Sequence, residues 1–400
     1  MAGGLMQLVA YGAQDVYLTG SPQITFFKVV YRRHTNFAME SMEQTLNGNA
    51  SFGSKVVCRI ARNGDLVGAC YVEVNLPAGD DSTNDDWCNR VGFRLLKQVE
   101  LRIGGQMIDR QTGLWMHVWS ELTHSDEQKR LLDSLVGESN ANGDPAGSKK
   151  NDEETKLFIP LMFSFCRNPG LALPLIALQY HEVELHIEFS TLAECKSSAG
   201  SADPFSNNKV LGNVTVWCDY IFLDTEERRD FAQEPHEYLI ETVQNQEHSI
   251  SGTSTNSLRL NFNHPCKELM WVAQKDSNSG DQFTDFTNDA SSSAAGSVGM
   301  VEEAKLLLNG QDRFAARGDV YFNRVQPYQH HTGCPDLGVY CYSFALKPEE
   351  HQPSGTCNFS RIDNANLNVK CKGTCKLTVM AHCYNVLRCA SGMGGLAYSN

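Results

Sequence analysis

The sequence predicts an all-β protein built from two consecutive copies of one antiparallel domain, with a few short helices in the loops. Three observations lead to this fold class. Apolar and polar residues alternate in several segments, tight-turn dipeptides separate these segments, and one glycine-containing motif recurs after about half of the chain. At 400 residues the chain is long enough for two domains that each bury a core.

The predicted strands follow from the alternation. Residues 183–189 (VELHIEF) place apolar side chains on one face and polar ones on the other, and residues 71–76 do the same. The dipeptides Asn47-Gly48, Asn63-Gly64 and Asn309-Gly310 predict tight hairpins, because both residues tolerate a positive φ. With eight strands in each copy, those of the first copy are expected near residues 40–47, 54–62, 66–76, 94–104, 107–114, 157–166, 180–189 and 213–223.

The long loops of this scheme are polar. Residues 77–93, 115–156 and 190–212 are rich in Asp, Asn, Ser and Gly, and we expect them to share one end of the first domain. Residues 277–299 form the corresponding loop in the second copy.

Two helices are predicted. A capping box at Ser125 starts one whose apolar face ends before Gly137, and the other covers residues 224–229. Residues 233–235, which end in a proline, form a joint between domains. The predicted division is an N-terminal arm at 1–24, a first domain at 25–224, a linker at 225–236 and a second domain at 237–400.

The two copies are recognised by an internal echo. Residues 101–106 (LRIGGQ), with Gly113 seven residues after the last of them, match residues 306–311 (LLLNGQ), with Gly318 in the same position. Residues 163–165 and 342–344 form a fainter second match. Short glycine hairpins also recur by chance, so the duplication is the economical interpretation.

Four segments carry a resemblance to a known family: residues 11–37, 62–66, 223–241 and 352–363. The first is apolar and aromatic and is punctuated by Gly20-Ser21-Pro22, so it fits docking rather than catalysis. Together they resemble the double jelly-roll major capsid proteins of large nucleocytoplasmic DNA viruses, especially the algal-virus branch.

The resemblance implies two consecutive eight-stranded antiparallel jelly-roll domains and a homotrimer. Six jelly rolls would form a pseudo-hexagonal capsomer that tiles the icosahedral shell of a large double-stranded DNA virus. The implied partners are neighbouring capsomers and minor capsid proteins, with the arm at the base near an internal membrane. The protein would be made in the host cytoplasm and reside in the virion, with no enzymatic activity and no cofactor.

The composition agrees with a shell protein. The formal charge of −13 would repel a phosphate backbone, so direct nucleic-acid binding is not expected. No apolar run is long enough to span a bilayer, and the first residues lack the basic region of a signal peptide. We therefore expect a protein made and kept in the cytosol until assembly.

The fourteen cysteines are scattered singly through the predicted strands, which favours reduced, buried thiols over disulfides. The nearest approach to a metal cluster is Cys371 and Cys375 with His382 and Cys383. No CxxC pair is present, and no metal site is predicted.

No catalytic residue is predicted either. His181 and His186 are five positions apart, so they converge on a metal neither in a strand nor in a helix. His330 and His331 with Cys334 are a second possible ligand group, but a polar loop is the better interpretation.

The alternative function is a cytosolic jelly-roll carbohydrate-binding or cupin-type protein, because fold alone does not decide function. Trp87 and Phe205 could serve as sugar-binding aromatic residues. Asn49, Asn213 and Asn358 begin Asn-x-Ser/Thr triplets and are the glycosylation candidates, although a cytosolic product favours chance triplets.

Overall fold

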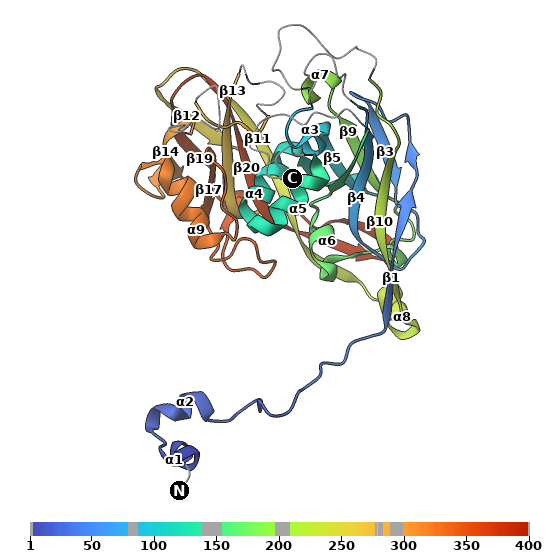
Figure 1. The fold of residues 1–400 in the computed structure, drawn as a ribbon, viewed down its shortest axis with the longest axis vertical. Coiled ribbons are helices and arrows are strands. Elements are labelled where there is room, and N and C mark those ends of the chain that lie inside the picture. Colours follow the sequence, from blue (N-terminus) through green and yellow to red (C-terminus); the bar gives the residue numbers. More distant parts are fainter. Residues whose placement is uncertain are drawn as a thin grey trace. The chain divides into compact units, whose positions relative to one another are not determined.

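The computed structural model describes residues 3–78, 87–137, 154–196, 209–276, 278, 283–288 and 299–398. The chain divides into a short unit, Met1–Asn36, and a large unit, Phe37–Asn400. The short unit holds α1 (Gly3–Val9), η1 (Ala13–Asp15) and α2 (Val16–Thr19), followed by an extended segment (Figure 1). None of its described residues is buried.

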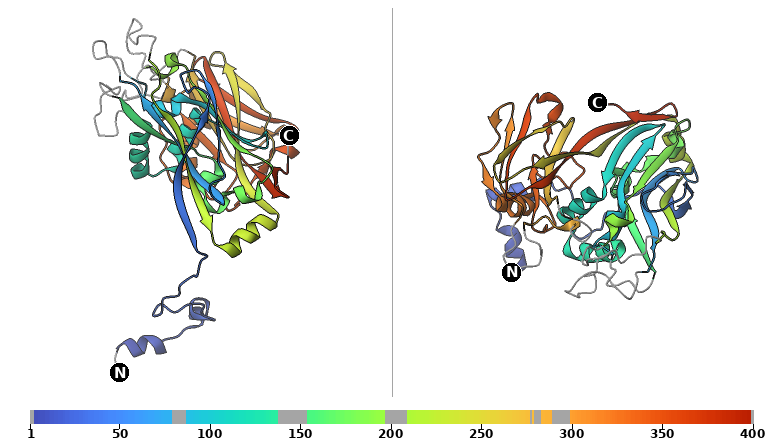
Figure 2. Two further views of the ribbon diagram at one scale, coloured as in Figure 1. Left: turned by 90° about the vertical axis from the view of Figure 1, so that its right-hand side faces the viewer. Right: turned by 90° about the horizontal axis from the view of Figure 1, so that it is seen from above.

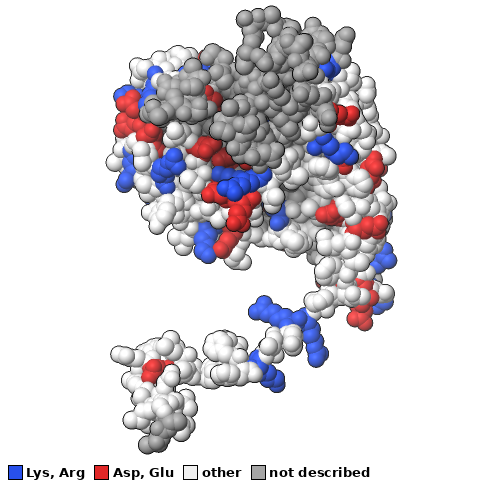
Figure 3. Space-filling view, viewed as in Figure 1, with Lys and Arg blue, Asp and Glu red and all other residues white. Residues whose placement is uncertain are grey.

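The first strand begins at Phe37, twelve residues after the start at residue 25 that the sequence suggested for the first domain. Residues 25–36 contain apolar side chains but pair with no described strand, so the structure groups them with the arm. Figure 3 shows a group of Lys and Arg side chains on the extended part of this segment, which contains Lys28, Arg32 and Arg33.

The first half of the large unit forms two antiparallel sheets, which we call the first sandwich. One has the order β1 (Phe37–Gln44), β10 (Val214–Leu223), β4 (Leu66–Leu76), β7 (Thr155–Pro160), with β8 (Leu173–Pro174) beside β4. The other has the order β2 (Leu46–Asn47), β3 (Lys55–Arg59), β9 (Val183–Phe189), β5 (Leu96–Ile103), β6 (Gln106–Thr112).

The second half forms another two sheets, the second sandwich. One has the order β11 (His236–Ile250), β20 (Cys375–Ala390), β13 (Pro265–Lys275), β17 (Val339–Ser343), with β18 (Cys357–Asn358) on β13 and β21 (Met393–Leu396) on β20. The other has the order β12 (Thr255–Leu260), β19 (Ala365–Cys371), β14 (Val301–Leu308), β15 (Gln311–Asp312), with β16 (Arg317–Gly318) on β14.

The two sandwiches have the same topology. Matched in chain order, β1, β10, β4 and β7 correspond to β11, β20, β13 and β17, and the facing sheets correspond in the same way. This is the strand order of a jelly roll, so the all-β double jelly-roll fold is confirmed. The count of eight strands per copy is not reproduced strand by strand, because two-residue strands such as β2 and β8 are added.

The echoed motif forms the same hairpin in both sandwiches. Gly104 and Gly105 connect β5 to β6 with φ values of 57° and 82°, and Asn309 and Gly310 connect β14 to β15 with 50° and 78°. Both central residues have positive φ, as a tight hairpin of this type requires. The echo therefore marks an equivalent structural position.

The helices lie in the connections. They are α3 (Val91–Leu95), α4 (Gly113–Thr123), α5 (Asp126–Val136), α6 (Ser164–Arg167), α7 (Leu192–Cys195), α8 (Thr225–Gln233), α9 (Gln326–His330), the 3₁₀ turns η3 (Pro169–Leu171), η4 (Leu175–Ala177) and η7 (Phe359–Arg361), and the π-helical η6 (Tyr321–Val325). The predicted helix after Ser125 is confirmed as α5, with its capping box and with Gly137 left-handed at its end. None of the described helices is long and apolar enough to cross a membrane.

Two expectations about local structure were wrong. Residues 115–156 were expected to be a loop, yet α4 occupies the start of this range because Thr112 caps it and nearly all its side chains are buried. Such burial gives no polar face, so a helical period is hard to see in the sequence. Residues 161–166 were assigned to a strand, but β7 ends at Pro160 and α6 follows.

The two sandwiches are joined by a sheet that is buried on both faces. In β13, Leu269 and Trp271 point into the core of the second sandwich, whereas Met270 and Val272 belong to the core that extends from the first. Figures 1 and 2 show β11, β13 and β20 between the remaining strands of the second sandwich and α4 of the first. We call this contact the seam.

Candidate functional site: a charge cluster buried in the seam

A β-bulge places the first charges of the site. β13 pairs with β20 through Cys266–Cys383 and then Glu268–His382, so Lys267 is an extra residue in the ladder. An extra residue lets two consecutive side chains leave a strand on one face. Lys267 and Glu268 accordingly both reach the seam and are 1% and 0% exposed.

Glu241 of β11 is the centre of the cluster. Its Oε1 accepts a hydrogen bond from Nζ of Lys267 at 2.7 Å. Its Oε2 lies 2.7 Å from Nη2 of Arg167, at the end of α6 in the first sandwich, and 3.3 Å from Nε2 of His382. A carboxylate from the second sandwich is thus paired with cations from both.

Glu268 connects the two histidines of the cluster. One oxygen lies 3.2 Å from Nδ1 of His382, and the other lies 2.8 Å from Nε2 of His331. The other nitrogen of His331 lies 3.0 Å from Oε1 of Glu349. The side chain of His331 is 0% exposed and sits between two carboxylates. We refer to Arg167, Glu241, Lys267, Glu268, His331 and His382 as the seam cluster.

α4 brings an aromatic side chain of the first sandwich onto this cluster. The ring of Trp119 meets the ring of His382 edge-on, with 4.8 Å between centroids, and the guanidinium carbon of Arg167 lies 4.6 Å from the Trp119 ring centre. An edge contact and a cation–π contact both add to the burial of the large ring.

A second buried group of charges surrounds Glu121 of α4. Nη1 of Arg90 lies 2.6 Å from Glu121, and Nη2 lies 2.8 Å from Asp133. Lys129 donates hydrogen bonds to Glu121 and to the carbonyl oxygen of Cys334, both at 2.8 Å. Because Cys334 belongs to the second sandwich, this group also bridges the seam.

The electrostatic environment keeps these glutamates charged. Burial acts to raise the pKa of Glu241 and of Glu268, but positive neighbours, led by His382 and His331 respectively, outweigh it and hold both well below the usual value. Burial likewise opposes ionisation of Glu121, yet Arg90 and other cations lower its pKa to about 2.

The pKa values of two buried histidines, His117 and His331, shift in opposite directions. Burial, helped by the charge of Arg90, lowers the pKa of His117 to about 3. Burial also acts to lower the pKa of His331, but Glu268 outweighs it and raises the pKa well above the usual value. His331 therefore contributes a positive charge to the cluster, whereas His117 is neutral.

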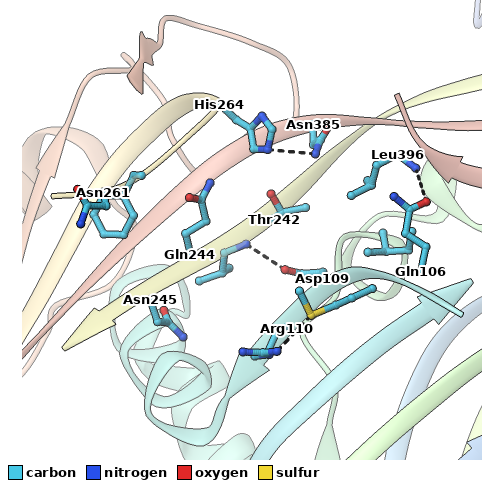
Figure 4. A pocket seen from close by; sticks show the side chains of 14 residues that line it. Gln106, Asp109, Arg110, Thr242, Gln244, Asn245, Asn261, His264, Asn385 and Leu396 are labelled. Atoms are coloured by element: carbon cyan, nitrogen blue, oxygen red, sulfur yellow. Dashed lines mark hydrogen bonds between the residues drawn. The ribbon is translucent and has the colours of Figure 1, made fainter. Parts of the chain in front are cut away.

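A polar cavity of about 490 Å³ follows the same seam (Figure 4). Gln106 and Asp109 of β6 face Thr242 and Gln244 of β11 across it, and Asp109 accepts a hydrogen bond from the backbone of Val243 at 3.0 Å. The side-chain amide of Gln244 donates a hydrogen bond to the carbonyl oxygen of Asn263 and accepts one from the N–H of the same residue. These polar groups connect neighbouring strands, so we interpret the cavity as part of the seam.

The arrangement is suited to fixing two sandwiches in one orientation. Each carboxylate of the seam cluster faces cationic partners, so the buried charges compensate one another within the cluster. The chemistry of the site is therefore an ionic lock, and its residues come from β11, β13, β20, α6 and the segment after α9.

The sequence-derived metal candidates do not converge. Cys371, Cys375 and Cys383 point into the second core, while His382 points the other way into the seam. Within the described ranges, no group of three or more His, Cys, Asp or Glu side chains could hold a metal ion. All fourteen cysteines are free, and most are buried.

The other candidates are dispersed. His181 lies against the backbone of Gly394 and His186 against Glu184, with no shared centre. His330 and Cys334 are separated in the same way, but His331, which the sequence suggested to be part of a polar loop, is a buried member of the seam cluster.

The candidate ligand and glycosylation positions differ in exposure. Trp87 is 1% exposed and stacks on Phe52, so it is a core residue and not a sugar platform. Phe205 lies outside the described residues. Asn49, Asn213 and Asn358 are all exposed, and Asn358 caps η7 by accepting a hydrogen bond from Ser360.

Sequence reasoning missed Arg167, Glu241, Lys267 and Glu268, and it placed His331 in a polar loop. The available signal was the pair Lys267-Glu268 inside an otherwise apolar strand, since buried charges in such a strand need partners. The pattern does not reveal which residues those partners are.

Comparison with known proteins gives two family matches. Residues 25–224 match the model described as "Major capsid protein N-terminus", and residues 227–395 match "Large eukaryotic DNA virus major capsid protein". The chain is 48% identical to the major capsid protein of Pyramimonas orientalis virus and 45% identical to that of Phaeocystis pouchetii virus, with full coverage of both chains in each case.

Two solved capsid structures are also similar to this chain. A quasi-atomic model of the PBCV-1 virus capsid matches with a TM-score of 0.83 and 40% identity, covering 94% of this chain and all of that one. The Faustovirus major capsid protein matches with a TM-score of 0.75 at 14% identity over 96% of each chain, which is a likeness of fold.

The seam cluster should be sensitive to removal of one charge. Replacing Glu241→Gln leaves Lys267 and Arg167 buried without their full partner, so we expect a loss of about 3–5 kcal/mol in unfolding free energy. The matched control is Glu237→Gln on the same strand, whose pair with Arg388 is exposed and should change stability by less than about 1 kcal/mol. Denaturant unfolding of both variants measures the difference, and equal effects would contradict the proposed lock.

The free energy of unfolding should fall on acidification because of His117. Its pKa is 6.5 without burial and about 3 in the fold, so the unfolded chain binds a proton below pH 6.5 that the folded chain does not. Stability is thus present above pH 6.5 and is lost as pH falls. Between pH 7.5 and 5.5 the wild type should lose about 1.4 kcal/mol more than His117→Gln. Parallel pH profiles from denaturant unfolding would count against a buried neutral His117.

Proposed function

Because the chain belongs to the family of large eukaryotic DNA virus major capsid proteins, we propose that three copies form a homotrimeric, pseudo-hexagonal capsomer. As a major capsid protein of a large DNA virus, it resides in the virion shell. We propose that its function is structural and consists of assembly into the shell.

The observation that carries the proposal is the repeated sandwich. Both sandwiches have the same sheet order, and the seam joins them into one body. Two such sandwiches in each of three chains supply six similar units, which is the number that a hexagonal outline needs. The domain boundaries at 25–224, 225–236 and 237–400 are part of this proposal, with residues 25–36 as the extended segment that leads into the first strand at Phe37.

The N-terminal arm is proposed to dock outside its own sandwich. Leu8, Tyr17 and Leu18 are 78%, 92% and 85% exposed, and apolar surface left in water costs about 25 cal/mol per Å². We propose that the arm binds at the base of the shell, against neighbouring capsomers and minor capsid proteins and close to an internal membrane.

Further parts of the proposal concern the life of the protein. Synthesis and assembly take place in the host cytoplasm, with no enzymatic activity, no bound metal and no direct contact with nucleic acid. The exposed triplets at Asn49, Asn213 and Asn358 are the places where a glycan could be attached, but capsomer formation does not depend on them.

The carbohydrate-binding or cupin-type alternative gains no support. A cupin requires histidines and a carboxylate that converge inside one barrel, whereas His331, His382 and Glu268 meet one another in the seam between the two sandwiches. Of the two aromatic candidates for sugar stacking, Trp87 is buried and Phe205 lies outside the described residues.

Native mass spectrometry of the purified chain tests the capsomer. The expected result is a complex of three copies that persists at micromolar concentration. A stable monomer under the same conditions would refute the trimer and reopen the binding-protein alternative.

Deletion of residues 1–24 tests the arm. We expect folded trimers with a melting temperature close to that of the full chain, because no described residue of this segment is buried. Incorporation into particles should be lost, as measured by co-assembly with full-length protein. Normal incorporation would exclude the docking role, and failure to fold would assign the arm to the trimer core.

A further inference from the structure

Each sandwich contains two cysteines that face one another on neighbouring strands. In the first sandwich, Cys70 of β4 lies opposite Cys218 of β10, and its thiol donates a hydrogen bond to the Cys218 sulfur with 3.1 Å between the two sulfur atoms. In the second sandwich, Cys266 of β13 lies opposite Cys383 of β20. All four side chains are at most 2% exposed, so these two inner pairs lie inside the cores.

The backbone at both inner pairs suits a disulfide bond. Residues directly opposite one another on antiparallel strands have Cα atoms about 4.5–5.5 Å apart, and disulfide bonds need about 4.4–6.8 Å. Opposite residues also point to the same face of their sheet, so the two sulfur atoms of a pair share one space. Closing an S–S bond at either pair therefore needs no change in the pairing of the strands.

A third, less buried cysteine lies beside each inner pair. Cys166, in α6, is hydrogen-bonded through its side chain to Cys70. Cys357, in β18, lies opposite Cys266 on the edge of β13 that faces away from β20. Cys166 and Cys357 are half-buried, and we call them the outer thiols. Each sandwich thus has a trio of cysteines that runs from an outer thiol to a buried inner pair.

The environment of the inner pairs protects them from direct attack on an outside reagent. The thiolate is the form that attacks a disulfide, and burial disfavours that charged form. Side-chain hydrogen bonds with Cys166 and Cys218, together with burial, raise the pKa of Cys70 well above its ordinary value, and burial does the same for Cys266. An oxidant is therefore expected to react first at an outer thiol.

We propose that the two trios are latent disulfide sites, which cross-link β4 to β10 and β13 to β20 when the protein meets a low-molecular-weight disulfide as the oxidant. The Cys166 thiolate attacks that disulfide, forms a mixed disulfide and releases one small thiol. Cys70 then attacks the Cys166 sulfur and releases the second small thiol. Finally Cys218 attacks the Cys70 sulfur, which forms the cross-strand bond and returns Cys166 to a thiol.

The exchange balances in atoms and electrons. The sulfur atoms of Cys70 and Cys218 are oxidised, the small disulfide is reduced to two thiols, and the two protons that the inner pair loses end on those thiols. The second trio reacts in the same order, from Cys357 through Cys266 to Cys383. Contact between neighbouring sulfur atoms offsets the low thiolate fraction of the inner thiols, because each later step takes place within the protein.

The cross-links have a clear effect on stability. Cys70 and Cys218 are distant in sequence, as are Cys266 and Cys383, so each bond closes a long stretch of chain and restricts the unfolded state. The reduced chain folds without this constraint, and the oxidised chain resists unfolding. This inference goes beyond the proposed capsomer and does not depend on the number of copies in it.

Peptide mapping after oxidation tests the sites. The purified full chain is incubated with oxidised glutathione, the remaining thiols are blocked with N-ethylmaleimide in denaturant, and unreduced digests are analysed by mass spectrometry. We expect peptides joined through Cys70–Cys218 and through Cys266–Cys383, with at least four of the fourteen thiols protected from the maleimide. Fourteen reactive thiols, or glutathione left on the outer thiols while both inner pairs stay reduced, would overturn the proposal.

The rate of cross-linking tests the order of exchange. Cys166→Ala should slow formation of the Cys70–Cys218 bond at least about tenfold, and Cys357→Ala should do the same for the other inner pair. Each variant should affect only its own sandwich. Cys334→Ala, which removes an exposed thiol outside both trios, is the matched control and should leave both rates unchanged. Rates in the outer-thiol variants equal to that of the control contradict the relay.

Thermal unfolding tests the effect on stability. Treatment with oxidised glutathione should raise the melting temperature of the wild type by about 5 °C or more, and a reductant should reverse the change. The double variant Cys70→Ala, Cys266→Ala lacks the middle cysteine of each trio and should show no such rise, with circular dichroism of the reduced variant as the check of folding. An equal rise in the double variant, or no rise in the wild type, would refute the stabilising cross-links.

Discussion

The structure depends on one sheet that is buried on both sides. Cys266–Ala273 of β13 have no solvent-facing residue, because one face completes the second core and the other receives α4. A strand in that position normally reads as a continuous apolar run. Here it also contains Lys267 and Glu268, and the bulge turns both toward the seam. The seam cluster, which helps to fix one sandwich relative to the other, follows from that exception.

Buried charges of this kind do not by themselves imply high stability. Removing ions from water costs several kcal/mol each, and pairing roughly offsets that cost. Their effect is to specify one relative orientation of the two sandwiches. An apolar face could slide on α4 in several registers, whereas Glu241 meets Lys267, Arg167 and His382 together in one of them. The hydrophobic part of the seam drives the contact, and the seam cluster selects its geometry.

The sequence revealed the fold more completely than the site. Period-two alternation located β4 and β9, and the Asn309-Gly310 turn with its echo at Gly104-Gly105 revealed the duplication, since these signals are local. α4 was missed because a helix buried on all sides loses its polar stripe. His331 was taken for part of a polar loop because its partners, Glu268 and Glu349, are distant in sequence and only the fold brings them together.

The seam also has a mechanical consequence for a shell. α8, the segment between the sandwiches, has no buried residue, so it is a poor candidate for carrying load from one sandwich to the other. Force applied to either sandwich passes instead through the interlocked strands and charges of the seam. Each subunit then acts as a stiff plate without a hinge. When the particle is pressurised or indented, bending must occur at the joints between chains, and the subunits themselves keep their angle.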